Sequence, residues 1–116
     1  MTGRDRYDLE TRAAAQQKAV AVAAAILRRE LGVIEGARQL TSLGHDLVDD
    51  WRVDPDFLVV GALDSQTDHL PVGKVRNLWD PALLAAKDAL IQRIESEARH
   101  DFEQACRNIV SRFRDV

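Results

Sequence analysis

Hydrophobic and small residues recur every three or four positions over residues 7–31, the spacing of one face of an α-helix. The segment is rich in Ala, Gln, Arg, Glu and Leu, which favour helix, and its alanines permit close approach of a neighbouring helix. We therefore expect a first helix over residues 7–31, after a frayed stretch at residues 1–6, and Gly32 as its left-handed cap. The predicted helix face consists of Ala13, Gln16, Val20, Ala23, Leu27 and Leu31.

A second helix is predicted over residues 33–43, with glycines inside it and directly after it. Its predicted apolar side is formed by Val33, Ile34, Ala37 and Leu40. Gly36 weakens the helix by about 1 kcal/mol relative to alanine, so we expect it to permit tight packing against the first helix. Gly44 is expected to end the second helix.

The dipeptide Asp54-Pro55 signals a third helix start, because aspartate accepts hydrogen bonds from free N–H groups and proline fits the first turn. It predicts a short helix over residues 55–63. The β-favouring run at residues 57–60 leaves a buried strand as the alternative. Helix is preferred because the sequence offers no second clear strand as a pairing partner.

Asp80-Pro81 repeats the start signal and opens the longest predicted helix, which ends near Phe113. Before it, we expect an ordered loop at residues 64–73 and one or two helical turns at residues 72–79. The apolar stripe of the long helix is Leu83, Ala86, Leu90, Ile94, Ala98, Phe102, Ala105, Ile109 and Phe113. The residues expected to be largely buried are Val20, Leu90, Ile94, Phe102 and Ile109.

These elements predict a single all-α domain over residues 1–116, a small bundle with two long helices, one or two short ones and an irregular middle. The net charge of −3 provides no general basic field, so no nucleic-acid partner is expected. The most apolar run, residues 19–27, is too short to span a bilayer. Acidic residues precede it where a signal peptide has basic ones, so we expect a cytoplasmic protein without a membrane partner. Cys106, the only cysteine, is expected to be a buried apolar residue.

Charge is segregated along the chain: residues 45–70 contain seven aspartates and a single cationic side chain, that of Arg52. Some of these aspartates suit caps and turns, as Asp54 does. The functional hypothesis is an acidic docking face that attracts a basic protein, with tryptophan anchors. We expect Arg76 to hold the loop by pairing with Asp64 or Asp68. The predicted partner-binding residues are Asp49, Asp50, Trp51, Asp64, Asp68, His69, Arg76 and Trp79.

Two alternatives to this binding protein remain open. His45-Asp46 and Asp68-His69 combine imidazole and carboxylate, the ligand types of a metal-assisted hydrolase, but no metal or other cofactor is expected. The second alternative is a structural homodimer built on the alanine-rich first helix. No Gly-rich phosphate loop and no Gly-x-Ser-x-Gly nucleophile motif occurs, so an enzyme is the less favoured interpretation.

Several short runs resemble a family of small uncharacterised bacterial proteins. The resemblance covers about residues 25–113, and its most specific part is Asp-Ser-x-Thr-Asp-His-Leu-Pro at residues 64–71. The other matching runs are Leu-Gly-Val-Ile-Glu-Gly-Ala-Arg at residues 31–38, Asp-Pro-Asp-Phe at residues 54–57, Gly73, Arg76, Trp79 and Ala-Cys-Arg at residues 105–107. The resemblance implies a bacterial cytoplasmic protein and supplies no catalytic residue. Small size and acidity suggest an immunity-like or regulatory role.

Overall fold

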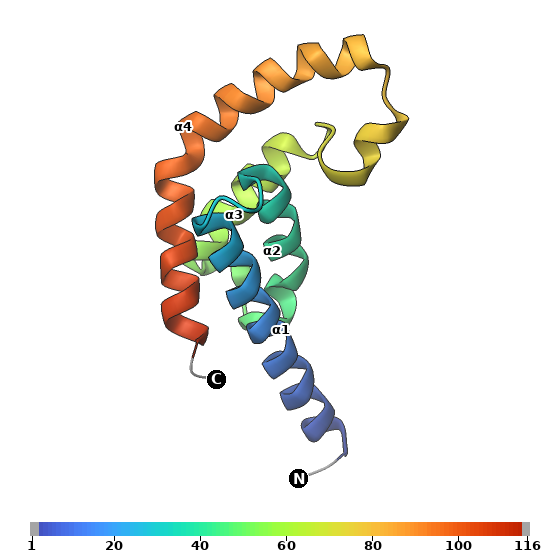
Figure 1. Cartoon of the computed structure of the whole chain (residues 1–116). Helices are drawn as coiled ribbons and strands as arrows, with labels where there is room; N and C mark the ends of the chain where they lie inside the picture. Colours follow the sequence, from blue (N-terminus) through green and yellow to red (C-terminus); the bar gives the residue numbers. More distant parts are fainter. Residues whose placement is uncertain (1–2, 115–116) are drawn as a thin grey trace.

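Only helices and the turns between them occur in the computed structural model, which describes residues 3–114 and the side chains of residues 9–114. The predicted all-α class is therefore confirmed, and the alternative of a strand at residues 57–60 is wrong. In chain order the elements are α1 (Gly3–Leu27), α2 (Val33–Leu47), η1 (Trp51–Val53), α3 (Pro55–Thr67), η2 (Gly73–Leu78) and α4 (Pro81–Phe113), η1 and η2 being 3-10 helices. Helix α1 packs against α2 and α4, and α3 contacts the same two helices from the other side (Figure 1).

The core is built around small side chains of α1. Ala15, Ala19 and Ala23 are at most 4% exposed, and Ile26 is fully buried. The predicted face is therefore rotated, since Val20 and Leu27 are only half-buried. Because alanines have no bulk beyond Cβ, the alanine stripe lets the helix axes come closest and becomes the contact face. The bundle itself covers these three alanines, so a homodimer built on the first helix would have to use its other face.

The ends of α1 differ from the prediction. The helix starts at Gly3 rather than Tyr7, and residues 1–2 of the stretch predicted to be frayed lie outside the described part. It ends at Leu27, and the left-handed residue is Arg29, with φ of 61°. The Arg29 N–H donates to the Ile26 carbonyl at 3.0 Å and the Glu30 N–H to that of Ala25 at 2.9 Å, which closes the helix. Gly32 is extended instead and precedes α2.

Two glycines of α2 make close contacts. A Cβ on Gly36 would collide with the Ile26 side chain, lying 2.7 Å from its Cγ1, so the predicted tight packing against α1 is confirmed. Gly44 does not end the helix, which continues to Leu47. It is buried beneath the ring of Phe57, and packing against α3 outweighs its low helix propensity. The predicted apolar side of α2 is fully buried at Val33, Ile34, Ala37 and Leu40.

Both predicted aspartate caps are confirmed. Asp54 accepts hydrogen bonds from the N–H groups of Asp56 and Phe57, and Asp80 accepts one from that of Ala82. Helix α3 runs to Thr67, past the predicted end at Leu63, and the Thr67 hydroxyl donates to the Leu63 carbonyl at 2.7 Å. The predicted loop at residues 64–73 is therefore shortened to residues 68–72, followed by η2.

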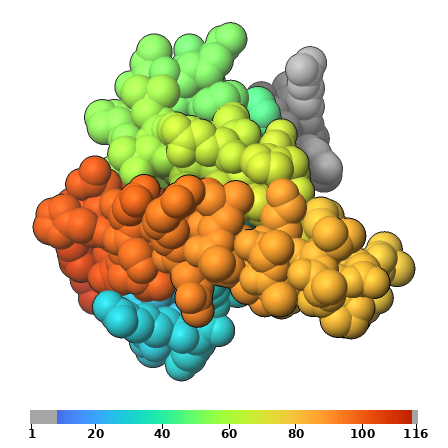
Figure 2. Space-filling model, turned by 90° about the horizontal axis from the view of Figure 1, so that it is seen from above, coloured from blue at the N-terminus to red at the C-terminus, as the bar shows by residue number. Residues whose placement is uncertain are grey.

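Helix α4 has the predicted bounds, but only part of its apolar stripe is core. Phe102 and Ile109 are fully buried, as predicted, whereas Leu90 and Ile94 are half-buried. Buried residues of α4 begin at Ile91. The first ten residues of the helix extend past the bundle together with η2 (Figures 1 and 2), in a molecule that measures 56 × 28 × 24 Å. We call η2 and residues 79–90 the arm.

Candidate functional site

The eight residues predicted to bind a partner lie in three separate regions of the fold. Asp49, Asp50 and Trp51 lie between α2 and α3; Asp64, Asp68 and His69 lie at the end of α3; Arg76 and Trp79 belong to the arm. Helix α3, with 13 residues and a length of about 20 Å, separates the first group from the second. The structure thus distributes the predicted acidic segment over two ends of the α2–α3 pair.

The first group surrounds a shallow hollow of about 300 Å³, lined by His45, Asp49, Asp50, Trp51 and Arg52. The rings of His45 and Trp51 meet edge to face with centroids 6.0 Å apart, and Trp51 covers Gly61 of α3. Asp49 pairs with Arg12 at 3.0 Å although its side chain is 96% exposed. Asp50 binds both the side chain and the backbone N–H of Arg52, and these bonds lower its pKa. The two carboxylates of the hollow thus already have cationic neighbours.

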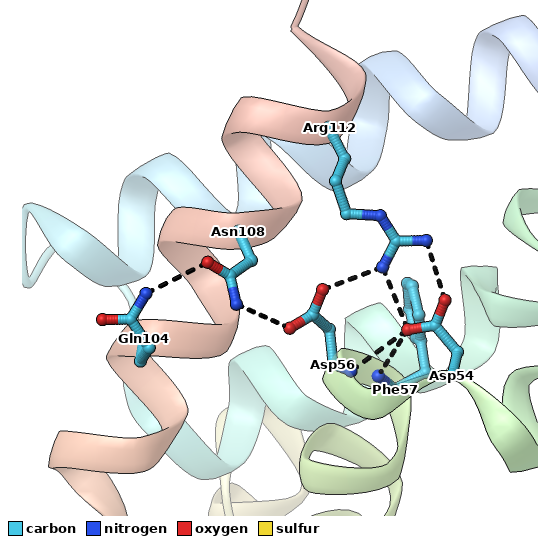
Figure 3. Close-up of polar contacts among 6 residues, drawn as sticks. All are labelled: Asp54, Asp56, Phe57, Gln104, Asn108 and Arg112. Atoms are coloured by element: carbon cyan, nitrogen blue, oxygen red, sulfur yellow. Dashed lines mark hydrogen bonds and ion pairs between the residues drawn. The ribbon is translucent and has the colours of Figure 1, made fainter.

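Asp54 and Asp56 share one cation, Arg112 of α4 (Figure 3). The guanidinium donates to both Asp54 oxygens, at 3.0 and 2.7 Å, and to Asp56 Oδ2 at 2.8 Å. Hydrogen bonding to Arg112 is the main cause that lowers the pKa of Asp54. Asn108, one turn earlier, donates to the other Asp56 oxygen at 2.9 Å. The cluster ties the start of α3 to the end of α4 and explains why Asp56 is tolerated at 8% exposure.

The short loop at residues 68–72 is held by Arg38 of α2, a contact that the sequence analysis did not predict. The Arg38 guanidinium donates to the carbonyl of Thr67 and, at 2.8 Å, to that of Leu70. Leu70 and Pro71 are buried beneath it. The side chain that binds this loop is therefore Arg38, through backbone carbonyls, and not one of the expected aspartate–arginine pairs.

Arg76 does not pair with Asp64 or Asp68, and that prediction is wrong. It forms a bidentate ion pair with Asp88 of α4, at 2.7 and 3.0 Å, and donates to the Pro71 carbonyl at 3.2 Å. Asp64 lies in the last turn of α3, where partial burial raises the pKa of its carboxyl. Because α3 extends to Thr67, Asp64 lies on the helix and not in the loop. The partner of Arg76 is instead Asp88, which lies 12 positions further along the chain.

The residues of the metal-hydrolase alternative do not come together. His45 and Asp46 lie near the amino end of α3, and Asp68 and His69 follow its carboxyl end. Asp68 Oδ1 lies 3.7 Å from Nδ1 of its chain neighbour His69. Within the described residues no group of three or more His, Cys, Asp or Glu side chains is placed to bind a metal ion.

Cys106 and His100 lie apart from these regions. Cys106 is fully buried in the core, as predicted, and burial raises the pKa of its thiol to about 12. The thiol is therefore protonated at neutral pH and a poor nucleophile. His100 is exposed on α4.

The arm carries the largest departure from the expected burial. Residues 81–86 read Pro-Ala-Leu-Leu-Ala-Ala, an uncharged run, yet none of them is buried. Leu78 is 87% exposed and Leu83 57%, and Val75 of η2 is also exposed. The sequence analysis placed Leu83 and Ala86 on the apolar stripe of this helix, because periodicity shows which residues share a face but not whether another helix covers that face. The uncharged run at residues 81–86 is the sequence feature that could have drawn attention to this surface. Its exposure became clear only from the positions of the other helices.

Comparisons with known proteins leave the site to be judged on its own geometry. No family model, no curated protein and no solved structure matches the chain. Among the described residues, no helix has the length and apolar character needed to cross a membrane.

Proposed function

We propose that this protein is a non-enzymatic binding domain that holds a protein partner through the apolar outer face of its arm. The observation that carries the proposal is the exposure of Leu78 at the end of η2 and of Leu83 in the first turn of α4, where residues 82, 85 and 86 are exposed alanines. Exposed apolar patches are a mark of protein–protein contact sites, whereas single exposed apolar residues are ordinary. Trp79 and Arg76, which the sequence also favoured as partner-binding residues, belong to the same arm.

The arm is pre-organised for binding. The Arg76–Asp88 ion pair links η2 to the first turns of α4. Between them, Asp80 caps the start of α4 and Pro81 occupies its first turn. Its base is packed into a small cluster around Ile34, Leu70 and Ile91. Because these contacts order the backbone before a partner arrives, less conformational entropy is lost on binding.

Site-specific photo-crosslinking in living cells tests the proposal. A photoreactive phenylalanine analogue replaces Leu78 on the arm or, as the matched control, Leu58, which is 47% exposed on α3. We expect a discrete crosslinked protein at Leu78 that is absent at Leu58 and is lost when Leu83→Glu is added. Absence of any crosslink at Leu78 would contradict the proposal.

A second candidate surface is the hollow around Asp49, Asp50 and Trp51, which we propose would take a basic partner. Its support is the high exposure of Asp49 together with a half-buried tryptophan at the same place. Asp49→Asn should weaken such binding and raised salt should slow association, while Asp64→Asn, at the other end of α3, serves as the control. If Asp49→Asn and high salt leave binding to a basic partner unchanged, this candidate fails. In a bacterial cytoplasmic protein, as the family resemblance implies, either surface would suit an immunity-like or regulatory role.

A further inference from the structure

We infer that the arm of this chain binds a second copy of itself, with the two α4 helices antiparallel across a two-fold axis between residues 84 and 85. The inference rests on the proposed function and names the partner of the same surface. An isologous contact of this kind requires a face that is complementary to itself. The order of residues along the exposed face of α4 meets that requirement.

The exposed face of the arm has the spacing of a helix-pairing seam. Leu83, Ala86 and Leu90 are separated by three and four residues, the alternation of the two core positions in a coiled coil. Leu83 and Ala86 are exposed, so this part of the seam is open, whereas Leu90 is half-buried because it also packs against the cluster of Ile34, Leu70 and Ile91 at the base of the arm. In an antiparallel pair with the stated axis, Leu83 faces Ala86 of the second copy, and Trp79 lies at the same end as Leu90 of the second copy.

The side chains that flank the seam fit the same register. On one side, Asp80 lies opposite Lys87 of the second copy. Because the two-fold axis repeats this contact, the dimer contains two opposite-charge contacts. On the other side, Ala82 lies opposite Ala89 of the second copy, and small residues there let the helices approach closely. Ala82 and Ala89 are both exposed in the monomer.

The charges select the antiparallel orientation. In a parallel pair Asp80 and Lys87 would each lie across the seam from their own copies, and Lys87 would face Ala82 of the second copy, so neither opposite-charge contact would form. The remaining acidic group of this segment, Asp88, is already bound to Arg76, so it leaves the seam without an added negative charge. A second copy is therefore favoured over a strongly charged protein, because the seam is nearly neutral and its few charges complement each other.

Sedimentation equilibrium on the whole chain tests the association. We expect a reversible dimer whose dissociation constant rises at least about tenfold in Leu83→Glu and in Lys87→Glu. The matched controls are Leu58→Glu, on an exposed leucine of α3, and Lys74→Glu, the same charge change on the arm but off the seam; neither should weaken the dimer. A monomer at all concentrations up to about 1 mM, or equal effects of test and control variants, would overturn the inference.

Disulfide trapping tests the register. The native Cys106 is buried, so one new cysteine per chain reports on the seam. A mixture of Ala82→Cys and Ala89→Cys chains should form a mixed disulfide dimer under mild oxidation, and neither variant alone should do so. Dimers formed as readily by Ala82→Cys alone, or no mixed disulfide, would overturn the antiparallel register.

The photo-crosslinking experiment separates this inference from the proposed function. A crosslink from Leu78 to a second copy supports both. A crosslink only to a different protein overturns the second-copy inference and leaves the binding function standing. No crosslink overturns both.

Discussion

At the residue scale, the two glycines of α2, Gly36 and Gly44, differ in whether the packing around them leaves room for a side chain. At Gly36 an added Cβ overlaps the Ile26 side chain, whose Cγ1 would lie only 2.7 Å away. At Gly44 the nearest side-chain atom would lie 3.6 Å away, which is ordinary contact. The close approach of α1 and α2 therefore depends on the absence of a side chain at Gly36 alone.

We predict that Gly36→Ala lowers the free energy of unfolding by about 1–3 kcal/mol, because overpacking outweighs the gain in helix propensity. Gly44→Ala is the matched control and should be neutral or raise stability by up to about 1 kcal/mol. Urea denaturation followed by circular dichroism measures both. Equal effects of the two substitutions would show that propensity, and not the contact with Ile26, decides.

Arg112 is the residue that joins α3 to α4 by charge. We predict that Arg112→Gln costs about 1–2 kcal/mol at neutral pH, a modest figure because its side chain is 35% exposed and partly screened by solvent. Arg107→Gln, on the same helix but more exposed, should cost less than about 0.5 kcal/mol. Urea midpoints of the three proteins at neutral pH provide the comparison.

The Asp54–Arg112 ion pair should also make the stability of the protein depend on pH. The pKa of Asp54 is held below its ordinary value of 3.8, chiefly by hydrogen bonding to Arg112. Its contribution to stability is therefore complete above the unfolded-state pKa and is lost as pH falls through the lower folded-state value. We expect the stability difference between wild type and Arg112→Gln to shrink as pH is lowered below about 4. A difference that stays constant down to pH 2 would rule out the ion pair as its source.

At the scale of elements, α4 consists of two parts with different roles. From Ile91 onward it supplies buried core residues, most of them against α1 and α3, whereas residues 81–90 contribute only the half-buried Leu90, which packs against the cluster around Ile34. The helix is continuous through both parts because Asp80 caps its start and helix-forming residues such as alanine, lysine and leucine predominate in its first turns.

The two parts should respond differently to truncation. Phe102→Ala should cost about 3–5 kcal/mol, since the ring is fully buried. Leu83→Ala should change monomer stability by less than about 0.5 kcal/mol, because the side chain is 57% exposed. Denaturation at a concentration low enough to give monomer is the appropriate measurement. A large loss in Leu83→Ala there would place this side chain in the core after all.

At the scale of the whole molecule, α1, α2, α3 and the second part of α4 enclose the core, and the arm extends from it (Figure 1). Because a second copy would bind the folded chain and not the unfolded one, association adds to stability by mass action. We predict that the melting temperature rises with protein concentration for the wild type and is independent of it for Leu83→Glu. Differential scanning calorimetry over a hundredfold range of concentration measures this, and a concentration-independent wild type would speak against self-association.

The sequence by itself determined the class of the fold and the ends of its longest helix. Local signals were sufficient there: Asp80-Pro81 starts α4, Asp54-Pro55 starts α3, and spacing in threes and fours defines the apolar sides. Cap hydrogen bonds and helix periodicity involve residues a few positions apart, so they can be read from the chain alone. The burial of Cys106 and the close packing at Gly36 followed from the same local reasoning.

Only the tertiary structure decided how charges pair and which apolar surface stays open. Arg112 lies 58 positions from Asp54, and Arg38 lies 32 from the Leu70 carbonyl that it binds, so neither contact has a local signature. Likewise, Leu83 and Phe102 belong to one stripe of one helix, but only Phe102 is covered, because the neighbouring helices stop short of the arm. Periodicity specifies a face, and the reach of the other helices determines whether that face becomes core or contact surface.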